Sequence, residues 1–206
     1  QYISNLKHGA WQQSGLKNST MPVNFGVGMV LHQKTMGIWG FGKIGQLVAG
    51  YAKAFGMKVV TWSPNMTSER AAAVGAESVS LDILMQTSDI VSLHIVASPT
   101  TKGMINQEKL ALMKKDALLI NTSRSTLVDT GALVQALQKQ SIGGAALDVF
   151  DIEPLPADHP LRSTPNTLLT PHLGFVAEPV FKSFTTGVVE SLEAWLNGQA
   201  IIRPLP

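Results

Sequence analysis

The stretch Met36-Gly37-Ile38-Trp39-Gly40-Phe41-Gly42-Lys43-Ile44-Gly45 decides the fold of this chain. A short apolar segment leads into the pattern Gly-x-Gly-x-x-Gly, a helical pattern follows, and residues 57–62 read as a second strand. In this order of strand, glycine turn, helix and strand, the pattern indicates dinucleotide binding, whereas a bare match is weak. Gly40 permits the tight turn, Gly42 lets the backbone approach a pyrophosphate, and Gly45 lets helix and strand pack closely. The N–H groups at the helix N-terminus would then face the phosphates.

Local signals beyond the glycine turn predict where further helices begin and end. Apolar residues at helical spacing predict that one face of the first helix consists of Ile44, Leu47, Val48, Tyr51 and Phe55. Ser80 and Asp129 are residue types that cap helix N-termini. Gly143-Gly144 is expected to close the helix that follows Asp129, and four prolines predict an extended loop at 151–166.

Strand and helix patterns alternate along the rest of the chain. Strands are expected at 36–39, 57–62, 77–79, 89–94, 117–121, 145–149 and 167–170, and helices at 44–55, 68–75, 81–85, 107–113, 129–138 and 180–196. Alternation of this kind is typical of a parallel sheet with helices on both faces. The sequence therefore predicts an α/β fold, a doubly wound Rossmann sheet.

Composition limits the kinds of partner. The chain has 206 residues, of which 45% are hydrophobic and 15% charged, as in a compact globular protein. Its net charge of +2 is too small to indicate nucleic acid or an anionic membrane as a partner. There is no cysteine for a disulfide or a thiolate metal site, and no apolar run approaches the length of a membrane span. We therefore expect a cytoplasmic protein that binds neither a metal, nor nucleic acid, nor a membrane.

Three polar clusters follow predicted strands, at the edge where ligands bind in an open parallel sheet. They are Asn121-Thr122-Ser123-Arg124, the segment from Asp148 to Glu153, and Pro171-His172. Each residue taken alone is more often structural than functional. Together they offer a cation, a carboxylate and an imidazole. An imidazole transfers protons near neutral pH, a carboxylate can orient it, and arginine can hold a substrate carboxylate in a bidentate fork. A hydride-transfer enzyme that acts on a hydroxy or keto acid needs this set.

Over nearly its whole length the chain resembles the D-isomer-specific 2-hydroxyacid dehydrogenases. The resemblance rests on six ordered motifs: Gly40-Phe41-Gly42-Lys43-Ile44-Gly45, Asp89-Ile90-Val91-Ser92-Leu93-His94, Leu119-Ile120-Asn121-Thr122-Ser123-Arg124, Val128-Asp129-Thr130-Gly131-Ala132-Leu133, Leu147-Asp148-Val149-Phe150-Asp151-Ile152-Glu153-Pro154, and Leu169-Thr170-Pro171-His172. It implies hydride transfer between NAD or NADP and a D-2-hydroxy acid or 2-keto acid. Glyoxylate, hydroxypyruvate and phosphoglycerate remain open as substrates.

The resemblance also implies roles for individual residues. Arg124 would bind the substrate carboxylate and carbonyl, His172 would be the acid/base, and Glu153 would be the partner of His172. Asp148 would contact the nicotinamide amide. The implied cofactor site consists of Gly40, Gly42, Lys43, Ile44, Gly45, Ser63, Asn65, Ile95, Val96, Thr101, Thr122, Ser123, Arg124, Asp148 and His172.

Some positions depart from the family pattern. NAD-dependent members carry an acidic residue at the end of the second strand, where this chain has Trp62-Ser63-Pro64-Asn65. Ser63 and Asn65 can bond a ribose hydroxyl without repelling a 2′-phosphate, and no Arg or Lys lies within that segment. We therefore expect both NAD and NADP to bind, with NAD marginally favoured. After His172 the chain continues Leu173-Gly174-Phe175 instead of with the usual small residues, which would alter the pocket wall.

The resemblance sets expectations for domains and assembly as well. Residues 1–16, with an apolar stripe of Tyr2, Ile3, Leu6, Ala10 and Trp11, would be the end of an interdomain helix. Residues 17–175 would be the dinucleotide domain, and 176–206 a helix and tail that return to a largely missing substrate domain. A homodimer is expected. The alternative is a dinucleotide-gated, corepressor-like binding module without turnover, although such a module has no need of Arg124, Glu153 and His172 together.

Overall fold

The structure, a computed structural model, describes residues 6–7 and 28–201. The chain divides into two compact units, residues 1–32 and 33–206. Most of the predicted helix at 1–16 lies outside the described residues. The second unit contains all of the strands described below.

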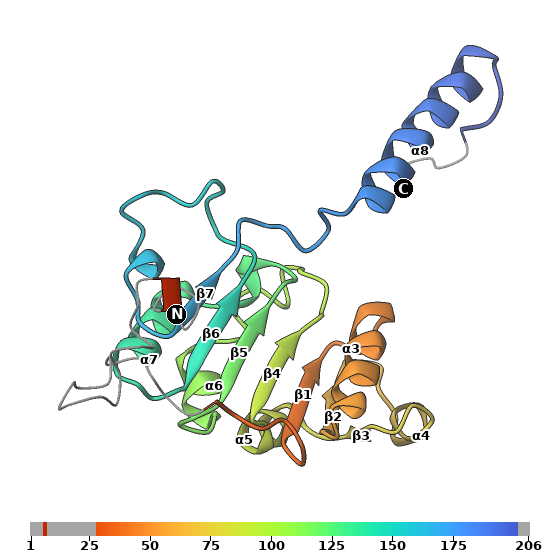
Figure 1. The fold of residues 1–206 in the computed structure, drawn as a ribbon. Helices are drawn as coiled ribbons and strands as arrows, with labels where there is room; N and C mark the ends of the chain where they lie inside the picture. Colours follow the sequence, from red (N-terminus) through yellow and green to blue (C-terminus); the bar gives the residue numbers. More distant parts are fainter. Residues whose placement is uncertain (1–5, 8–27, 202–206) are drawn as a thin grey trace. The chain divides into compact units, whose positions relative to one another are not determined.

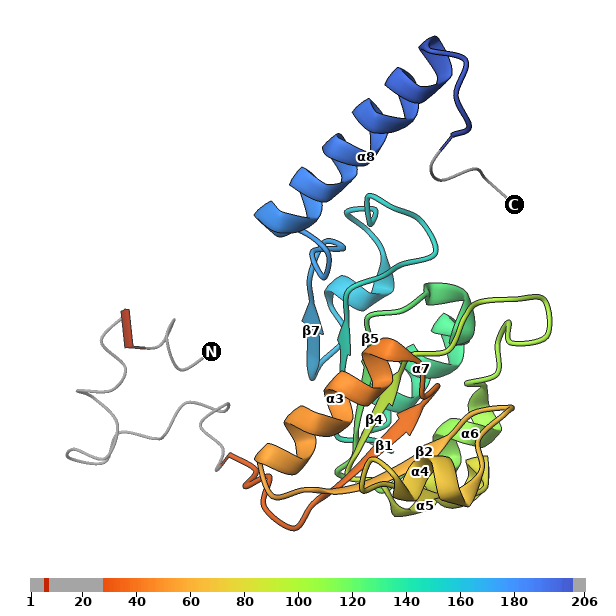
Figure 2. The same cartoon turned by 90° about the vertical axis from the view of Figure 1, so that its right-hand side faces the viewer.

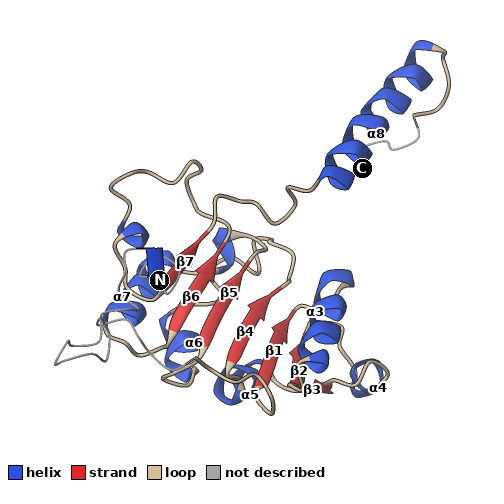
Figure 3. Ribbon diagram, in the orientation of Figure 1, coloured by secondary structure: helices blue, strands red, loops and turns tan. Residues whose placement is uncertain are grey.

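Seven strands form one sheet in the second unit (Figures 1 and 3). In chain order they are β1 Thr35–Trp39, β2 Lys58–Trp62, β3 Glu77–Ser78, β4 Ile90–Leu93, β5 Leu118–Asn121, β6 Gly144–Leu147 and β7 Thr167–Leu169. Neighbouring strands all pair in parallel, in the order β3-β2-β1-β4-β5-β6-β7. From β1 the strands β2 and β3 follow towards one edge of the sheet, and β4, β5, β6 and β7 follow towards the other edge. The predicted doubly wound Rossmann sheet is confirmed, and its switch point lies between β1 and β4.

Helices lie on both faces of the sheet, as predicted (Figure 2). They are α3 Lys43–Ala54, α4 Ser68–Ala72, α5 Leu81–Thr87, α6 Gln107–Leu112, α7 Thr130–Gln138 and α8 Glu178–Leu196, with short 3₁₀ turns at Ser125–Leu127 and Pro160–Arg162. Ile38 of β1 faces α3, because its Cγ2 is the side-chain atom nearest to a Cβ built on Gly45. Gly37, in the same strand, faces Leu84 of α5. The alternating side chains of β1 therefore meet helices on opposite faces.

The predicted helix caps are partly confirmed. The side chain of Ser80 accepts a hydrogen bond from Ile83 N, and that of Asp129 accepts one from Ala132 N. The prediction that Gly143-Gly144 closes α7 is wrong: the helix ends at Gln138, and Gln140 provides the left-handed turn with φ 52°. Gly144 already belongs to β6. These two glycines instead let neighbouring backbone segments lie close together, since a Cβ on Gly143 would lie 2.5 Å from the carbonyl oxygen of Asp116.

The predicted apolar face of α3 is not the face that packs on the sheet. The buried residues of α3 are small: Gly45, Ala49 and Ala52. The larger apolar residues of that predicted face are 58–64% exposed, namely Ile44, Leu47, Tyr51 and Phe55. The reason is the short distance between helix and strand, because a Cβ on Gly45 would overlap the carbonyl oxygen of Gly40. A helix this close to the sheet accepts only small side chains, so its apolar stripe points away from it.

One part of the sheet is left open in the described residues. Ile120, Ala146 and Leu168 are neighbours in register across β5, β6 and β7. Ile120 and Ala146 are half-buried, and Leu168 is exposed. Along α8 only Ala194 is buried, although the helix is rich in apolar residues. The described residues thus leave apolar surface on both the sheet and α8.

Two negative results concern the described residues alone. None of their helices has the length and apolar character needed to cross a membrane. Within the same residues, no group of three or more His, Cys, Asp or Glu side chains is placed to hold a metal ion.

Candidate active site

The glycine turn after β1 has a backbone that only glycine accepts. Gly40 has φ +97°, and its N–H donates to the carbonyl oxygen of Trp62 at 2.8 Å, which joins the turn to the end of β2. A Cβ on Gly40 would lie 2.5 Å from both His94 C and Ile95 N. The turn therefore packs directly against the segment after β4, at the switch point of the sheet.

The start of α3 fits a bound pyrophosphate. Gly42 is the N-cap of α3, no side chain caps it, and a Cβ built on it would have no neighbour within 4 Å. The first turn of a helix has N–H groups without helical partners, here those of Lys43, Ile44 and Gly45. No acidic residue stands in this turn to repel an anion. Open space, free donors and the positive end of the helix dipole together suit phosphate groups.

A cation that the sequence analysis missed, the guanidinium of Arg70 in α4, lies beside the loop that follows β2. Ser63 is half-buried and Asn65 is exposed. The guanidinium of Arg70 donates to the backbone oxygen of Asn65, although Arg70 lies five positions further along the chain. Thr67 caps α4 through a bond from Arg70 N, which places Arg70 in the first turn beside this loop. The segment 62–65 itself contains no Arg or Lys, but Arg70 reaches it from the helix that follows, and the Thr67 cap was the sequence signal for this contact.

The segment after β4 forms a compact loop with Thr101 at its centre. Ile95 is half-buried and Val96 is exposed. The hydroxyl of Thr101 accepts from Ser98 N at 2.7 Å and donates to Val96 O at 3.0 Å. Since Thr101 is buried and its hydroxyl is engaged, any contribution to cofactor binding would come through the shape of the loop. His94 precedes the loop, and burial lowers the pKa of its imidazole.

Asn121 organises the turn after β5. It is 1% exposed, its Nδ2 donates to Arg124 O at 2.9 Å, and its Oδ1 accepts from Ser123 N at 3.1 Å. The Ser123 hydroxyl donates to Ile95 O at 2.9 Å and so ties this turn to the loop after β4. Thr122 and Arg124 are exposed on the turn. The Arg124 side chain donates from Nη1 to Ser123 O, within its own turn. Arg124 is thus placed at the carboxyl edge of the sheet, and no carboxylate of the described residues 6–7 and 28–201 forms an ion pair with it.

Asp148 is an anchor for the segment that carries His172. It is 4% exposed at the end of β6. Its Oδ1 accepts from the Thr170 hydroxyl and from Leu173 N, and its Oδ2 accepts from Gly174 N. Burial alone would raise the pKa of Asp148, but these hydrogen bonds outweigh it and the pKa is lowered. A carboxylate has about four acceptor positions, so this one retains little capacity for a nicotinamide amide.

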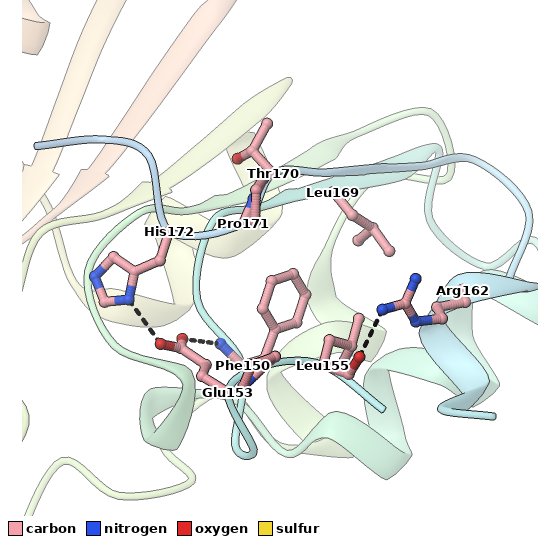
Figure 4. Close-up of a pocket in the computed structure, with 9 residues that line it drawn as sticks. Phe150, Glu153, Leu155, Arg162, Leu169, Thr170, Pro171 and His172 are labelled. Carbon is pink, nitrogen blue, oxygen red and sulfur yellow. Dashed lines mark hydrogen bonds and ion pairs between the residues drawn. The ribbon is translucent and has the colours of Figure 1, made fainter. Parts of the chain in front are cut away.

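His172 and Glu153 form a direct pair beyond the ends of β7 and β6 (Figure 4). The distance between His172 Nδ1 and Glu153 Oε2 is 2.8 Å, and Glu153 Oε1 accepts from Phe150 N, also at 2.8 Å. The hydrogen bond from His172 is the largest cause that lowers the pKa of Glu153, and the Phe150 N–H is the second. An ionised carboxylate only accepts hydrogen bonds. The Nδ1 atom of His172 therefore carries a proton, and Nε2 is the atom left to exchange one.

A cavity of about 630 Å³ borders this pair (Figure 4). Its lining consists of Phe150, Glu153, Pro154, Leu155, Arg162, Leu169, Thr170, Pro171 and His172. Arg162 closes the far end and donates from Nε to Pro156 O at 2.7 Å, so its cation also braces the proline-rich loop. The volume suits a small ligand. Arg162 was not among the site residues predicted from the sequence.

The glycine turn, the donors of α3 and the His172–Glu153 pair lie on one parallel sheet. Together they define a dinucleotide-binding α/β domain with an imidazole–carboxylate pair beyond the strand ends. Residues 1–174 match the family model described as "D-isomer specific 2-hydroxyacid dehydrogenase, NAD binding domain". The chain belongs to the D-isomer-specific 2-hydroxyacid dehydrogenase family.

Two curated relatives illustrate the similarity. D-3-phosphoglycerate dehydrogenase of Synechocystis is 44% identical over 172 residues, which are 84% of this chain and 31% of the relative. Glyoxylate reductase of Thermococcus litoralis is 39% identical over 194 residues, which are 94% of this chain and 57% of the relative. The chain thus spans 31% and 57% of the length of these two relatives.

Solved structures agree with this assignment. The phosphoglycerate oxidoreductase of Vibrio cholerae is 35% identical with a TM-score of 0.77, and the match covers 91% of this chain and 60% of that one. D-lactate dehydrogenase of Lactobacillus jensenii, solved with NAD⁺, is 28% identical with a TM-score of 0.79, and the match covers 100% and 62%. The fold predicted from the glycine turn is therefore the fold of the family.

Proposed function

We propose that the protein moves a hydride between a nicotinamide dinucleotide and carbon 2 of a small D-2-hydroxy acid or 2-keto acid. The observation that carries this proposal is the 2.8 Å hydrogen bond between His172 Nδ1 and Glu153 Oε2. It lies at the edge of the sheet where ligands of doubly wound folds bind. Membership of the dehydrogenase family supports the same reaction.

The site residues have complementary roles in this proposal. The bound nicotinamide would supply or accept the hydride. In oxidation, Nε2 of His172 would take the hydroxyl proton, and in reduction it would return it, while Glu153 holds Nδ1 and sets the direction of the ring. Arg124 would hold the substrate carboxylate and polarise the carbonyl, a role that its exposed guanidinium leaves open.

A panel of keto acids tests this function. Glyoxylate, hydroxypyruvate, pyruvate and 3-phosphohydroxypyruvate should be assayed with NADH and NADPH by loss of absorbance. We expect turnover of at least one of them to the 2-hydroxy acid, in the D configuration wherever carbon 2 of the product is a stereocentre. Dinucleotide binding without turnover of any acid would support the binding module instead. The relatives compared above carry the names of dehydrogenases and reductases, which favours the enzyme.

We propose that both NAD and NADP bind, and that Arg70 contributes to NADP binding by contacting the 2′-phosphate. The end of β2 lacks the acidic residue that would repel a 2′-phosphate, and the guanidinium of Arg70 is held beside Asn65. Affinities for the two forms should therefore differ by less than about a hundredfold, roughly 2.7 kcal/mol. Arg70→Gln should weaken NADP binding by about fivefold, roughly 1 kcal/mol for an exposed charged contact, and leave NAD binding unchanged. Isothermal calorimetry measures both.

Lys58→Gln is the matched control for Arg70→Gln. It removes the same charge from an exposed position at the opposite end of β2. If both variants weaken NADP binding equally, the effect is one of net charge, and Arg70 has no place at the phosphate.

The Glu153–His172 contact predicts a pH dependence. The pKa of Glu153 should lie below its ordinary value of 4.5 and rise towards that value in His172→Ala, because the bond from His172 is the largest cause that lowers it. A lowered pKa in the folded state means that the stabilisation by this carboxylate is present above pH 4.5 and is lost as the pH falls through the folded pKa. A ¹³C titration of the carboxyl group measures the shift. An unchanged pKa in the variant would contradict the pairing in solution.

We propose that residues 1–16 and 176–206 link this domain to a substrate domain, and that the protein is a homodimer. The exposed apolar residues of α3 and α8 support further packing partners, since contiguous exposed apolar surface marks contacts. Light scattering tests the dimer, and a monomer at micromolar concentration would count against it.

A further inference from the structure

The imidazole of His172 has a second neighbour besides Glu153. The ring of Phe175 meets it edge-to-face, with centroids 5.6 Å apart and an interplanar angle of 89°. This is a favoured geometry for aromatic pairs. Phe175 is 44% exposed, so the core of the protein does not require a large apolar residue there.

The backbone between the two rings is fixed. His172 has a left-handed conformation with φ 55°, which is costly for a residue with a Cβ and persists only where the surroundings hold it. The hydrogen bonds from Leu173 N and Gly174 N to buried Asp148 supply this hold, at 2.8 Å each. A Cβ on Gly174 would lie 3.1 Å from Asp148 Oδ2, so the segment approaches the carboxylate closely. Phe175 follows directly and is presented to the imidazole.

Phe175 is in turn supported by α8. Phe181, in the first turn of that helix, has its ring centroid 6.1 Å from that of Phe175, at an angle of 32°. Ala177 links the two residues through the backbone, since its N–H donates to Phe175 O and its carbonyl accepts from Phe181 N. A row of three rings therefore joins the start of α8 to the imidazole.

The hydrogen bond to Glu153 restrains the imidazole at one atom, Nδ1. Rotation about the Cβ–Cγ bond of histidine is broad, with no sharp staggered minimum. Proton transfer from a substrate hydroxyl requires that Nε2 point in one direction. The edge-to-face contact with Phe175 adds a second restraint on this rotation.

We propose that Phe175 is a positioning residue for the imidazole of His172, supported from α8 by Phe181. This inference rests on the proposed acid/base role of His172. Phe175 keeps the ring in the orientation in which Nδ1 bonds Glu153 and Nε2 faces the substrate. The position of α8 is thereby coupled to the direction of Nε2.

Kinetics of four variants test the proposal. Phe175→Leu should lower kcat by between about threefold and tenfold, the range expected for loss of one aromatic pair. The KM for the keto acid and the affinity for the dinucleotide should stay unchanged, because Phe175 would bind neither. Phe181→Leu should lower kcat less than Phe175→Leu does. Phe175→Tyr keeps an aromatic ring against the imidazole, so its kcat should equal that of the unaltered protein. Phe184→Leu is the matched control, the same change on an exposed phenylalanine of α8.

Imidazole NMR supplies a readout that does not depend on turnover. The chain has five histidines, so the signals of His172 can be assigned by their loss in His172→Gln. In Phe175→Leu these signals should move as the ring current disappears, and the Nδ1–H tautomer should become less dominant. Phe184→Leu should leave them in place.

The two measurements separate the two ideas. If Phe175→Leu matches Phe184→Leu in both kcat and the His172 signals, the positioning role is wrong. If the signals move while His172→Gln retains full turnover, the proposed acid/base function fails and the positioning of a catalytic ring fails with it. If turnover is lost in His172→Gln but is untouched in Phe175→Leu, the function stands and only the positioning role is overturned.

Discussion

His172→Ala is expected to lower turnover by about 10²- to 10⁴-fold, the range that a positioned general acid/base contributes. The reason is the placement of the imidazole, whose Nδ1 is bonded to Glu153 while Nε2 remains available to a substrate proton. Dinucleotide affinity should stay nearly unchanged, because the glycine turn and the start of α3, which would hold the pyrophosphate, do not include His172. Steady-state kinetics and calorimetry measure the two effects on one preparation.

Two further variants make this result interpretable. His172→Gln keeps a donor for Glu153 but cannot exchange a proton near neutral pH, so its turnover should fall as far as that of the alanine variant. His32→Ala removes an exposed histidine that precedes β1 and should have no effect. Turnover by His172→Gln close to that of the unaltered protein would assign the proton to another group.

Gly40→Ala is expected to destabilise the protein by ~2–5 kcal/mol, the sum of backbone strain and overpacking. Gly40 has φ +97°, and its Cβ would lie 2.5 Å from backbone atoms of His94 and Ile95 that cannot move aside without shifting β4. Since domains are stable by only about 5–15 kcal/mol, much of the reserve would be lost. Urea unfolding followed by tryptophan fluorescence measures the change, and dinucleotide binding should be lost as well.

Two other glycines of the same region separate folding from binding. Gly50→Ala lies within α3 with open space around the new Cβ, so it should stabilise the protein by ~0.5–1 kcal/mol. Gly42 has an ordinary φ of −75° and open space, so Gly42→Ala should fold normally. Its methyl group would occupy the position expected for the pyrophosphate, and binding should weaken. Normal binding by Gly42→Ala would contradict the placement of the phosphates.

The sequence by itself was sufficient for the architecture. The order of strand, glycine turn, helix and strand predicted the sheet, because periodicity and turn chemistry indicate the type and order of the elements from local sequence. The caps at Ser80 and Asp129 were confirmed for the same reason: a cap is completed within three residues. The ordered motifs likewise led to Glu153 and His172, which the structure brings to 2.8 Å.

Only the tertiary structure decided which residues face one another. The apolar stripe of α3 points away from the sheet because Gly45 packs against Gly40, and helical periodicity cannot tell how close a helix lies to its sheet. The carboxylate of Asp148 accepts hydrogen bonds from the N–H groups of Leu173 and Gly174, 25 and 26 positions away. These bonds fix the segment in which the ring of Phe175 contacts that of His172. Contacts over such sequence separations depend on how the chain folds back on itself, which local propensity does not encode.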